Sequence, residues 1–269
     1  DRAQALELLL IDPSGNLNLI DFVSKLGCDS RSGDQPLVLV GAFDETRMLG
    51  VALLRPCVLI SWGMPSPVLE ALLPDLLRVS TGLLKSDRRL VDPVWQALAE
   101  AGREAKLDRI EIAFRLEPEQ MAPVKPNLKG LARLARGEDL EALVDAARAS
   151  LLEEDRPDPA EVDPDGFRRW VEGRLSRARI VSDQGRIVFV AYVDVCRSEG
   201  WLVQGVYTWP DVRRRGFARR GMDAIVREAF VSGAAHVQLA VVEGNQPASR
   251  LYRELGFEIY GELRTVLFS

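Results

Sequence analysis

Apolar residues recur along most of the chain at two spacings, either every third or fourth residue or at alternate positions. The first spacing is typical of helices with one buried face, and the second of half-buried strands. Helical spacing predicts helices near residues 3–10, 15–26, 66–80, 91–102, 137–155, 163–173, 217–231 and 247–255. Alternation between turn residues predicts two strands within 36–56, three within 178–209, and single strands near 81–84, 108–114, 236–242 and 257–267.

The order of these elements indicates a layered α/β or α+β fold. In the second half, two helices precede an antiparallel meander, and helix and strand then alternate, which is typical of a sheet covered by helices. The stretch "LEPEQMAPVKPNLKG" (116–130) carries three prolines and few periodic apolar positions, as a linker would. We therefore predict an N-terminal α/β domain at 1–120, a linker at 121–130 and a second domain at 131–269.

Composition narrows the function classes. A net charge of −5 and a pI near 5.2 argue against general nucleic-acid binding. The three cysteines are far apart and there is one histidine, so we expect no disulfide framework and no metal site. No apolar run approaches the ~20 residues that cross a bilayer, and the first residues lack a secretion signature. We expect a cytoplasmic protein without membrane contact.

One short segment departs from the acidic balance. "VRRRGFARRG" (212–221) places five arginines in eight residues, at the start of the helix predicted for 217–231. Positive charge there opposes the helix dipole, and a bound anion would reverse that cost. The small residues Gly216 and Ala218 would let a phosphate approach the backbone. The segment lacks both GxxxxGK[ST] and GxGxxG, so it matches neither a nucleotide P-loop nor a dinucleotide fold. A solvated basic helix end is the alternative.

Arg213, Gly216 and Ala218 form the pattern Arg-x-x-Gly-x-Ala, which resembles the pyrophosphate-binding motif of the GNAT acetyltransferase superfamily. About 30 residues later, "EGNQPASRLYRELGFEIYGE" (243–262) resembles the downstream signature of that superfamily. Over roughly 131–269 the chain is similar to a bacterial family of tandem GNAT-like proteins. The resemblance implies a GNAT fold in the C-terminal half, with a mixed, mostly antiparallel sheet flanked by helices.

The strand–strand–helix–strand order of the N-terminal half matches a second, degenerate copy of the same fold, and we take it as a hypothesis. Its counterpart of the phosphate loop is expected near 83–98, a segment without glycine. We therefore expect this half not to bind the cofactor.

The resemblance also implies a site for acetyl-CoA. Backbone groups of Val206, Tyr207 and Thr208 would pair with the pantetheine arm, and Asn245 would hold pantetheine or orient its loop. The pyrophosphate would lie on the residues of the arginine–glycine loop, which are Arg213, Arg214, Arg215, Gly216, Phe217, Ala218 and Arg219. Surplus arginines would reach the 3′-phosphate of the adenosine.

The implied reaction is direct attack of an amine on the acetyl thioester, with Tyr252 as general acid. The general base stays open, because the strand before the loop carries Gln204 in place of a carboxylate. Glu154 in "LLEED" is our choice, and Glu243 or a chain of water molecules is the alternative. Tyr252 would otherwise be a core tyrosine, and Asn245 a helix cap.

We thus predict an N-acetyltransferase that uses acetyl-CoA and an amine acceptor, either a small molecule or a protein. A CoA-binding sensor or scaffold without turnover, and transfer of a longer acyl or aminoacyl group, are the alternatives. The sequence leaves open whether the protein is a monomer or a homodimer.

Overall fold

The computed structural model describes residues 2–26, 36–123, 132–154 and 156–269. The chain forms two compact units, each built from segments that are far apart in the sequence. The N-terminal unit comprises Asp1–Phe114, Ala240–Gln246 and Ile259–Ser269, and the C-terminal unit comprises Arg115–Leu239 and Pro247–Glu258. Most of the predicted linker, from 124 to 130, lies outside the described residues. The predicted boundaries 1–120 and 131–269 stay a prediction.

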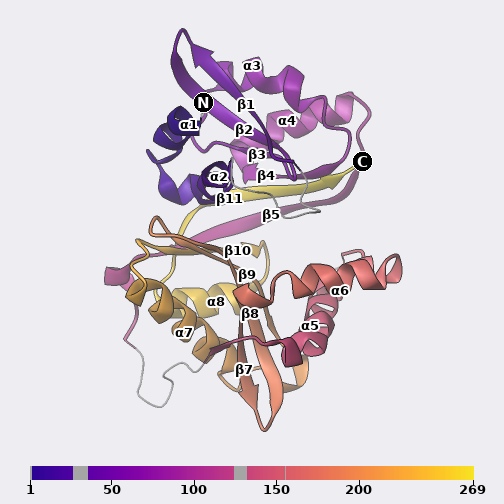
Figure 1. Ribbon diagram of the computed structural model, residues 1–269, viewed down its shortest axis with the longest axis vertical. Coiled ribbons are helices and arrows are strands. Elements are labelled where there is room, and N and C mark those ends of the chain that lie inside the picture. Colours follow the sequence, from indigo (N-terminus) through magenta and orange to yellow (C-terminus); the bar gives the residue numbers. More distant parts are fainter. Residues whose placement is uncertain (1, 27–35, 124–131, 155) are drawn as a thin grey trace. The chain divides into compact units, whose positions relative to one another are not determined.

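The N-terminal unit begins with helices, continues with the antiparallel meander β1-β2-β3 and then alternates helix and strand (Figure 1). In chain order its elements are α1 (Arg2–Leu9), α2 (Pro13–Ser24), β1 (Val38–Asp44), β2 (Arg47–Arg55), β3 (Leu59–Ile60), α3 (Ser66–Leu76), β4 (Gly82–Asp87), α4 (Arg88–Glu100) and β5 (Ala105–Leu116). Strand β2 is buried on both faces. Its Val51 and Leu53 pack with α1 and α2, whereas Ala52 packs with α3 and α4. This alternation follows from the two-residue period of a strand.

The last strand of the chain, β11 (Glu258–Phe268), completes the sheet of the N-terminal unit. It runs antiparallel to β4, with pairs from Leu263–Asp87 to Phe268–Gly82, and β5 is its neighbour on the other side. Its Val266 and Phe268 are buried in the same core as helices α3 and α4. The N-terminal unit therefore depends on residues from the C-terminal end of the sequence.

The C-terminal unit is a helix-covered sheet with strand order β10-β9-β8-β7-β6. Its elements are β6 (Arg133–Leu134), α5 (Leu140–Glu153), α6 (Pro164–Glu172), β7 (Ala178–Asp183), β8 (Arg186–Cys196), β9 (Trp201–Thr208), α7 (Phe217–Val231), β10 (Val237–Val242) and α8 (Gln246–Leu255). Strands β9 and β10 are parallel, and the other pairs are antiparallel. The prediction of a mixed, mostly antiparallel sheet flanked by helices is confirmed.

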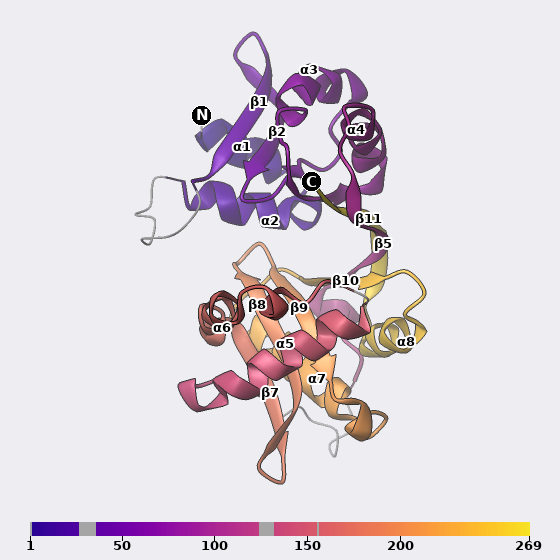
Figure 2. The same cartoon turned by 90° about the vertical axis from the view of Figure 1, so that its right-hand side faces the viewer.

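Helices α5 and α7 cover opposite faces of this sheet (Figure 2), as neighbouring residues of β8 show. Val190 belongs to the core that includes Leu143 of α5. The ring of Phe189, which points to the other face, lies so close to Gly221 of α7 that a Cβ there would overlap it. The glycine thus lets α7 approach the sheet closely.

One element of the N-terminal unit differs from the sequence prediction. Strand β3 was missed, because two residues are too few to show an alternating pattern. Val58, the residue before β3, forms a parallel bridge to Leu84 of β4. The segment 83–98, where the counterpart of the phosphate loop is expected, forms most of β4 and α4, and this expectation stays a prediction.

A buried carboxylate joins the three strands at the edge of the N-terminal unit. Glu111 of β5 accepts from the Nζ of Lys85 on β4 (2.6 Å), the Nε of Arg109 (3.0 Å) and the hydroxyl of Thr265 on β11 (2.8 Å). Burial by itself would raise the pKa of Glu111, but the charges of Lys85 and Arg109 outweigh it. The pKa falls from its ordinary 4.5 to about 2.

We expect Glu111 to stabilise the fold above about pH 4.5 and to lose this contribution as the pH falls toward 2, because its folded-state pKa is depressed. Glu111→Gln should lower the free energy of unfolding at pH 7 by on the order of 3 kcal/mol, since it leaves two cations without their counter-charge. Urea unfolding between pH 7 and pH 2.5 measures both effects. The exposed Glu100→Gln serves as control, and parallel pH dependences for wild type and Glu111→Gln would contradict the assignment.

Candidate functional site

Strand β9 contains a β-bulge just before the arginine–glycine loop. Tyr192 of β8 pairs with Gln204 and Val190 pairs with Tyr207, so β9 has one residue more than β8 between these pairs. Gly205, within the bulge, adopts a φ of +57°. On its other edge, β9 pairs with β10 at Trp201 and Leu202. The predicted pantetheine-binding residues are Val206, Tyr207 and Thr208. They follow Gly205 in the chain, and the described pairing of β9 with β10 does not include them.

The loop after β9 turns sharply into α7. Arg214 and Gly216 both adopt left-handed backbone angles, with φ of +62° and +82°. This conformation suits glycine, whereas it costs an arginine roughly 1–2 kcal/mol. A Cβ at Gly216 would meet no atom within 4 Å, so the surface in front of the helix is open.

Helix α7 starts without a cap. Its first hydrogen bond runs from the N–H of Arg220 to the carbonyl of Gly216 (3.0 Å), and no side chain caps the helix. Within the described parts of the chain, the N–H groups of Phe217, Ala218 and Arg219 donate to no acceptor. Free amides at a helix start, next to left-handed backbone, form an anion-binding surface.

Most arginines of the loop are already paired. Arg213 binds Glu153, Arg215 contacts Asp183 at 3.1 Å, and Arg219 contacts Glu254 of α8 at 2.8 Å. Arg214 is exposed and forms no ion pair with the part of the chain that the structure describes. The loop thus presents backbone amides together with one unpaired guanidinium.

Glu153, the last residue of α5, ties three elements together. Its Oε1 accepts from the hydroxyl of Tyr207 on β9 (3.0 Å), and both Oε1 and Oε2 accept from the Nη2 of Arg213 (2.7 and 2.6 Å). Arg213 also donates to the carbonyl of Thr208 (2.8 Å). Burial, followed by the hydrogen bond to Glu153, raises the pKa of Tyr207 to about 12. The end of α5 therefore positions both the strand and the loop.

The structure brings Glu153 to the loop, not the neighbouring Glu154. Glu154 directly follows α5 and is exposed, as Glu153 is, but its carboxylate lies near Arg156 (3.9 Å). Its role as base stays a prediction. The sequence places Glu153 in the same acidic cluster from which Glu154 is chosen, and the buried positions Leu143 and Ala146 of α5 put residue 153 on their face of the helix.

The other two predicted residues lie on and beside α8. Tyr252 is buried, its ring packs edge-on against Phe257, and burial raises the pKa of its hydroxyl, so the phenol is protonated at neutral pH. Arg219 links the start of α7 to α8 through Glu254, two residues after Tyr252. Asn245 lies in the exposed turn between β10 and α8, where its N–H donates to the carbonyl of Val242 (3.1 Å).

The described residues also bear on the expectations about metal and membrane. Within the described residues, no group of three or more His, Cys, Asp or Glu side chains is arranged to hold a metal ion. No helix in that part of the chain is long and apolar enough to cross a membrane.

Residues 140–257 match the sequence model of the acetyltransferase (GNAT) family. This segment belongs to the GNAT family. It is 28% identical over 109 residues to the SPbeta prophage-derived uncharacterized N-acetyltransferase YokL of Bacillus subtilis (strain 168), a match that covers 38% of the chain and 62% of that relative. The similarity to this relative is therefore limited to less than two thirds of its length.

Solved structures resemble the whole chain, including the half outside the GNAT segment. A GCN5-related N-acetyltransferase from Sphaerobacter thermophilus has a TM-score of 0.58 and 17% identity, covering 99% of the chain and 92% of that protein. A tandem GNAT protein from the clavulanic acid biosynthesis pathway has a TM-score of 0.50 and 14% identity, covering 99% and 93%. At these identities the likeness concerns the fold, and it confirms the GNAT fold predicted from the sequence.

We expect Glu153→Gln to lower the pKa of Tyr207 below about 12 while leaving it above the ordinary 10, because the charged acceptor is lost and the burial remains. Tyrosinate absorbance during a pH titration measures this, with Tyr207→Phe to assign the signal and circular dichroism to define the folded range. Glu154→Gln is the matched control and should change nothing. An equal shift in both variants would show that Glu153 has no special contact with Tyr207.

Proposed function

We propose that the protein is an N-acetyltransferase that transfers the acetyl group of acetyl-CoA to an amine acceptor by direct attack. One observation carries the proposal: α7 begins with free amides behind an open, left-handed Gly216, within a segment of the GNAT family. A diphosphate fits such a surface, because it needs several N–H donors and close approach to the backbone.

The residues of the chain fit the cofactor part by part. The amides from Arg214 to Arg219 would hold the pyrophosphate, and the unpaired Arg214 is the loop residue suited to the 3′-phosphate. Val206 and Thr208 lie beyond the described pairing with β10, so their backbone groups are suited to the pantetheine amides, like an added strand. Asn245 would hold the other side of the pantetheine arm.

When bound, acetyl-CoA would supply an activated thioester. Tyr252 would hold the proton that the departing sulfur needs, a role that fits a phenol kept neutral by burial. Glu154 would accept the proton that the attacking amine loses. Glu153 would act through Arg213 as a positioning residue, since both of its oxygens are occupied.

We expect Gly216→Glu to abolish CoA binding, because it places a carboxylate in front of the amides that would hold the pyrophosphate. Calorimetric titration of acetyl-CoA measures the affinity. Gly216→Gln imposes the same left-handed strain and nearly the same bulk without charge, so it should bind CoA more weakly than wild type but better than Gly216→Glu. Wild-type affinity in a folded Gly216→Glu variant would refute the loop assignment.

A CoA-binding sensor without turnover is the second candidate. It is favoured by the absence of a carboxylate on β9, where Gln204 stands, and by the engagement of Glu153 with Arg213 and Tyr207. A sensor would need the loop and the strand but would not need an acid or a base.

Tyr252→Phe separates the two functions. In an acetyltransferase, loss of the general acid should reduce kcat about 10²-fold while the affinity for CoA is unchanged. Turnover across a panel of amines and parallel calorimetry measure both quantities. Tyr192→Phe is the control, since Tyr192 is also buried and its hydroxyl has no hydrogen-bond partner among the described residues. Tight CoA binding with no acetylated amine would favour the sensor.

A further inference from the structure

Strand β1 leaves one edge of the N-terminal unit unpaired. Among the described residues, β1 pairs with β2 alone, and no strand or isolated bridge lies on its other side. Such an edge presents a row of free N–H and C=O groups to any other strand. Soluble proteins usually protect it with charged side chains, prolines, bulges or a covering segment. The edge of β1 therefore needs one of these protections or a partner.

The sequence of β1 offers little protection. From Leu37 to Phe43 the chain reads LVLVGAF, without a charged or polar side chain. The register between β1 and β2 shifts twice, but the extra residues at the shifts, Leu49 and Leu54, both belong to β2. Strand β1 itself is not bulged, so it presents an uninterrupted apolar edge.

Side chains on both faces of β1 are only partly covered. Val40 and Ala42 lie against the core of α3 and α4. Leu37 and Leu39 lie against the core of α1 and α2, on the other face. None of these four side chains is fully buried, and Phe43 is 48% exposed. A further strand beside β1 would cover apolar side chains on both faces.

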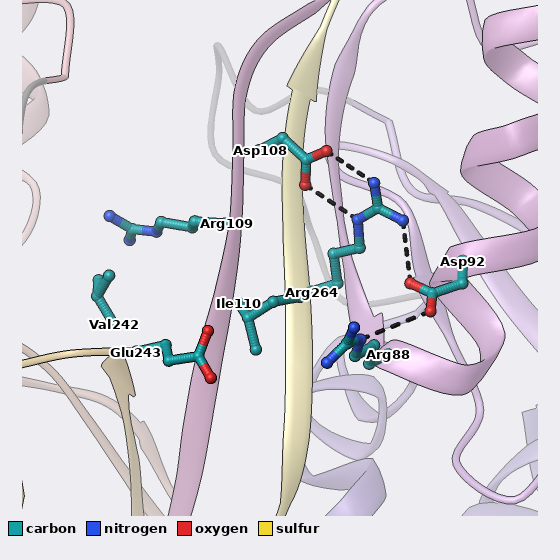
Figure 3. Close-up of a pocket in the computed structure, with 8 residues that line it drawn as sticks. All are labelled: Arg88, Asp92, Asp108, Arg109, Ile110, Val242, Glu243 and Arg264. Atoms are coloured by element: carbon teal, nitrogen blue, oxygen red, sulfur yellow. Dashed lines mark hydrogen bonds and ion pairs between the residues drawn. The ribbon is translucent and has the colours of Figure 1, made fainter.

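Strands β5 and β11 of the same unit have a charged surface instead. Arg264 of β11 donates to both oxygens of Asp108 on β5 (2.9 and 2.7 Å) and to Asp92 of α4 (3.0 Å), as Figure 3 shows. Such matched charges disfavour the approach of an apolar strand, because they would lose water on its arrival. The contrast indicates that β1 is the strand of this unit suited to an apolar partner.

We propose that β1 pairs antiparallel with the β1 of a second copy of this chain, about a two-fold axis at Val40. The apolar run has three residues on each side of Val40, so this register pairs the whole run with itself. The facing pairs are then all apolar, namely Leu37–Phe43, Val38–Ala42, Leu39–Gly41 and Val40–Val40. Facing apolar side chains on neighbouring strands stabilise a sheet.

Charge and symmetry favour this arrangement. Asp44 follows the apolar run, so a parallel pair in register would place two Asp44 carboxylates side by side, which is destabilising. The antiparallel pair separates them to opposite ends. A two-fold pair also uses the same edge of both copies, so the assembly closes at two chains. The inference does not rest on the proposed function, since the proposed cofactor loop belongs to the C-terminal unit.

Sedimentation equilibrium of the full chain from about 1 to 200 µM tests the pairing, since one pair of strands forms a small interface of modest affinity. Wild type should be a dimer at the upper concentrations. Phe43→Lys should weaken dimerisation by roughly tenfold or more, because a lysine on an edge strand opposes pairing. Val231→Lys is the matched control, since Val231 of α7 is also exposed and apolar, and it should have no effect. Circular dichroism verifies that both variants are folded.

Val40→Cys tests the register. The two copies of residue 40 would face each other with Cα atoms about 4.5–5.5 Å apart, within reach of a disulfide. Mild oxidation should therefore link Val40→Cys into a covalent dimer above the wild-type background. Phe43→Cys is the control and should not be linked, because the two copies of residue 43 would lie about 20 Å apart along the strands.

A wild type that is monomeric over the whole range would overturn the inference, and so would a dimer that Phe43→Lys leaves intact. Equal cross-linking of Val40→Cys and Phe43→Cys, or of neither, would contradict the antiparallel register. A monomeric wild type that binds a synthetic peptide of residues 36–44 would assign the edge to an extended segment of another protein instead.

Discussion

The proposed chemistry of this protein depends on the amides at the start of α7, which donate to no acceptor among the described residues. A helix normally satisfies its first N–H groups with a Ser, Thr, Asp or Asn cap or with water. Here Gly216 occupies the capping position and has no side chain to offer. The sequence therefore gives up roughly a few tenths of a kcal/mol of cap stability at this point, and a bound ligand with several oxygen atoms would regain it.

The charged side chains around the loop serve mainly to hold its shape. Arg213 donates hydrogen bonds to Glu153 and to the carbonyl of Thr208 at the end of β9. Arg219 donates to Glu254 and so connects the start of α7 with α8. Paired guanidinium groups repel one another less than free ones, so the ion pairs of Arg213, Arg215 and Arg219 reduce the charge repulsion within the loop. An arginine-rich sequence is consequently compatible with a site whose main contacts come from the backbone.

Local patterns in the sequence predicted the elements well, and long-range features poorly. Helix α7 has the predicted bounds, 217–231, because Gly216 and the apolar spacing that includes Met222 and Ile225 define them locally. Strands β3 and β6 are too short to show a period. The choice between Glu153 and Glu154 depends on which side of α5 faces β9, and the acidic run alone does not reveal that. Alternation in β11 predicts a strand but contains no information on its partner.

The pairing of β11 with β4 also bears on how the chain reaches its fold. Residues 82–87 pair with residues 263–268, so about 180 residues separate the partners. At ribosomal rates of 5–20 residues per second, β4 waits roughly ten to forty seconds for its neighbour. During translation the edge of the first sheet is open to any other strand. Neither half of the chain is therefore expected to fold well when expressed alone, because each would expose an unpaired β-strand edge prone to aggregation.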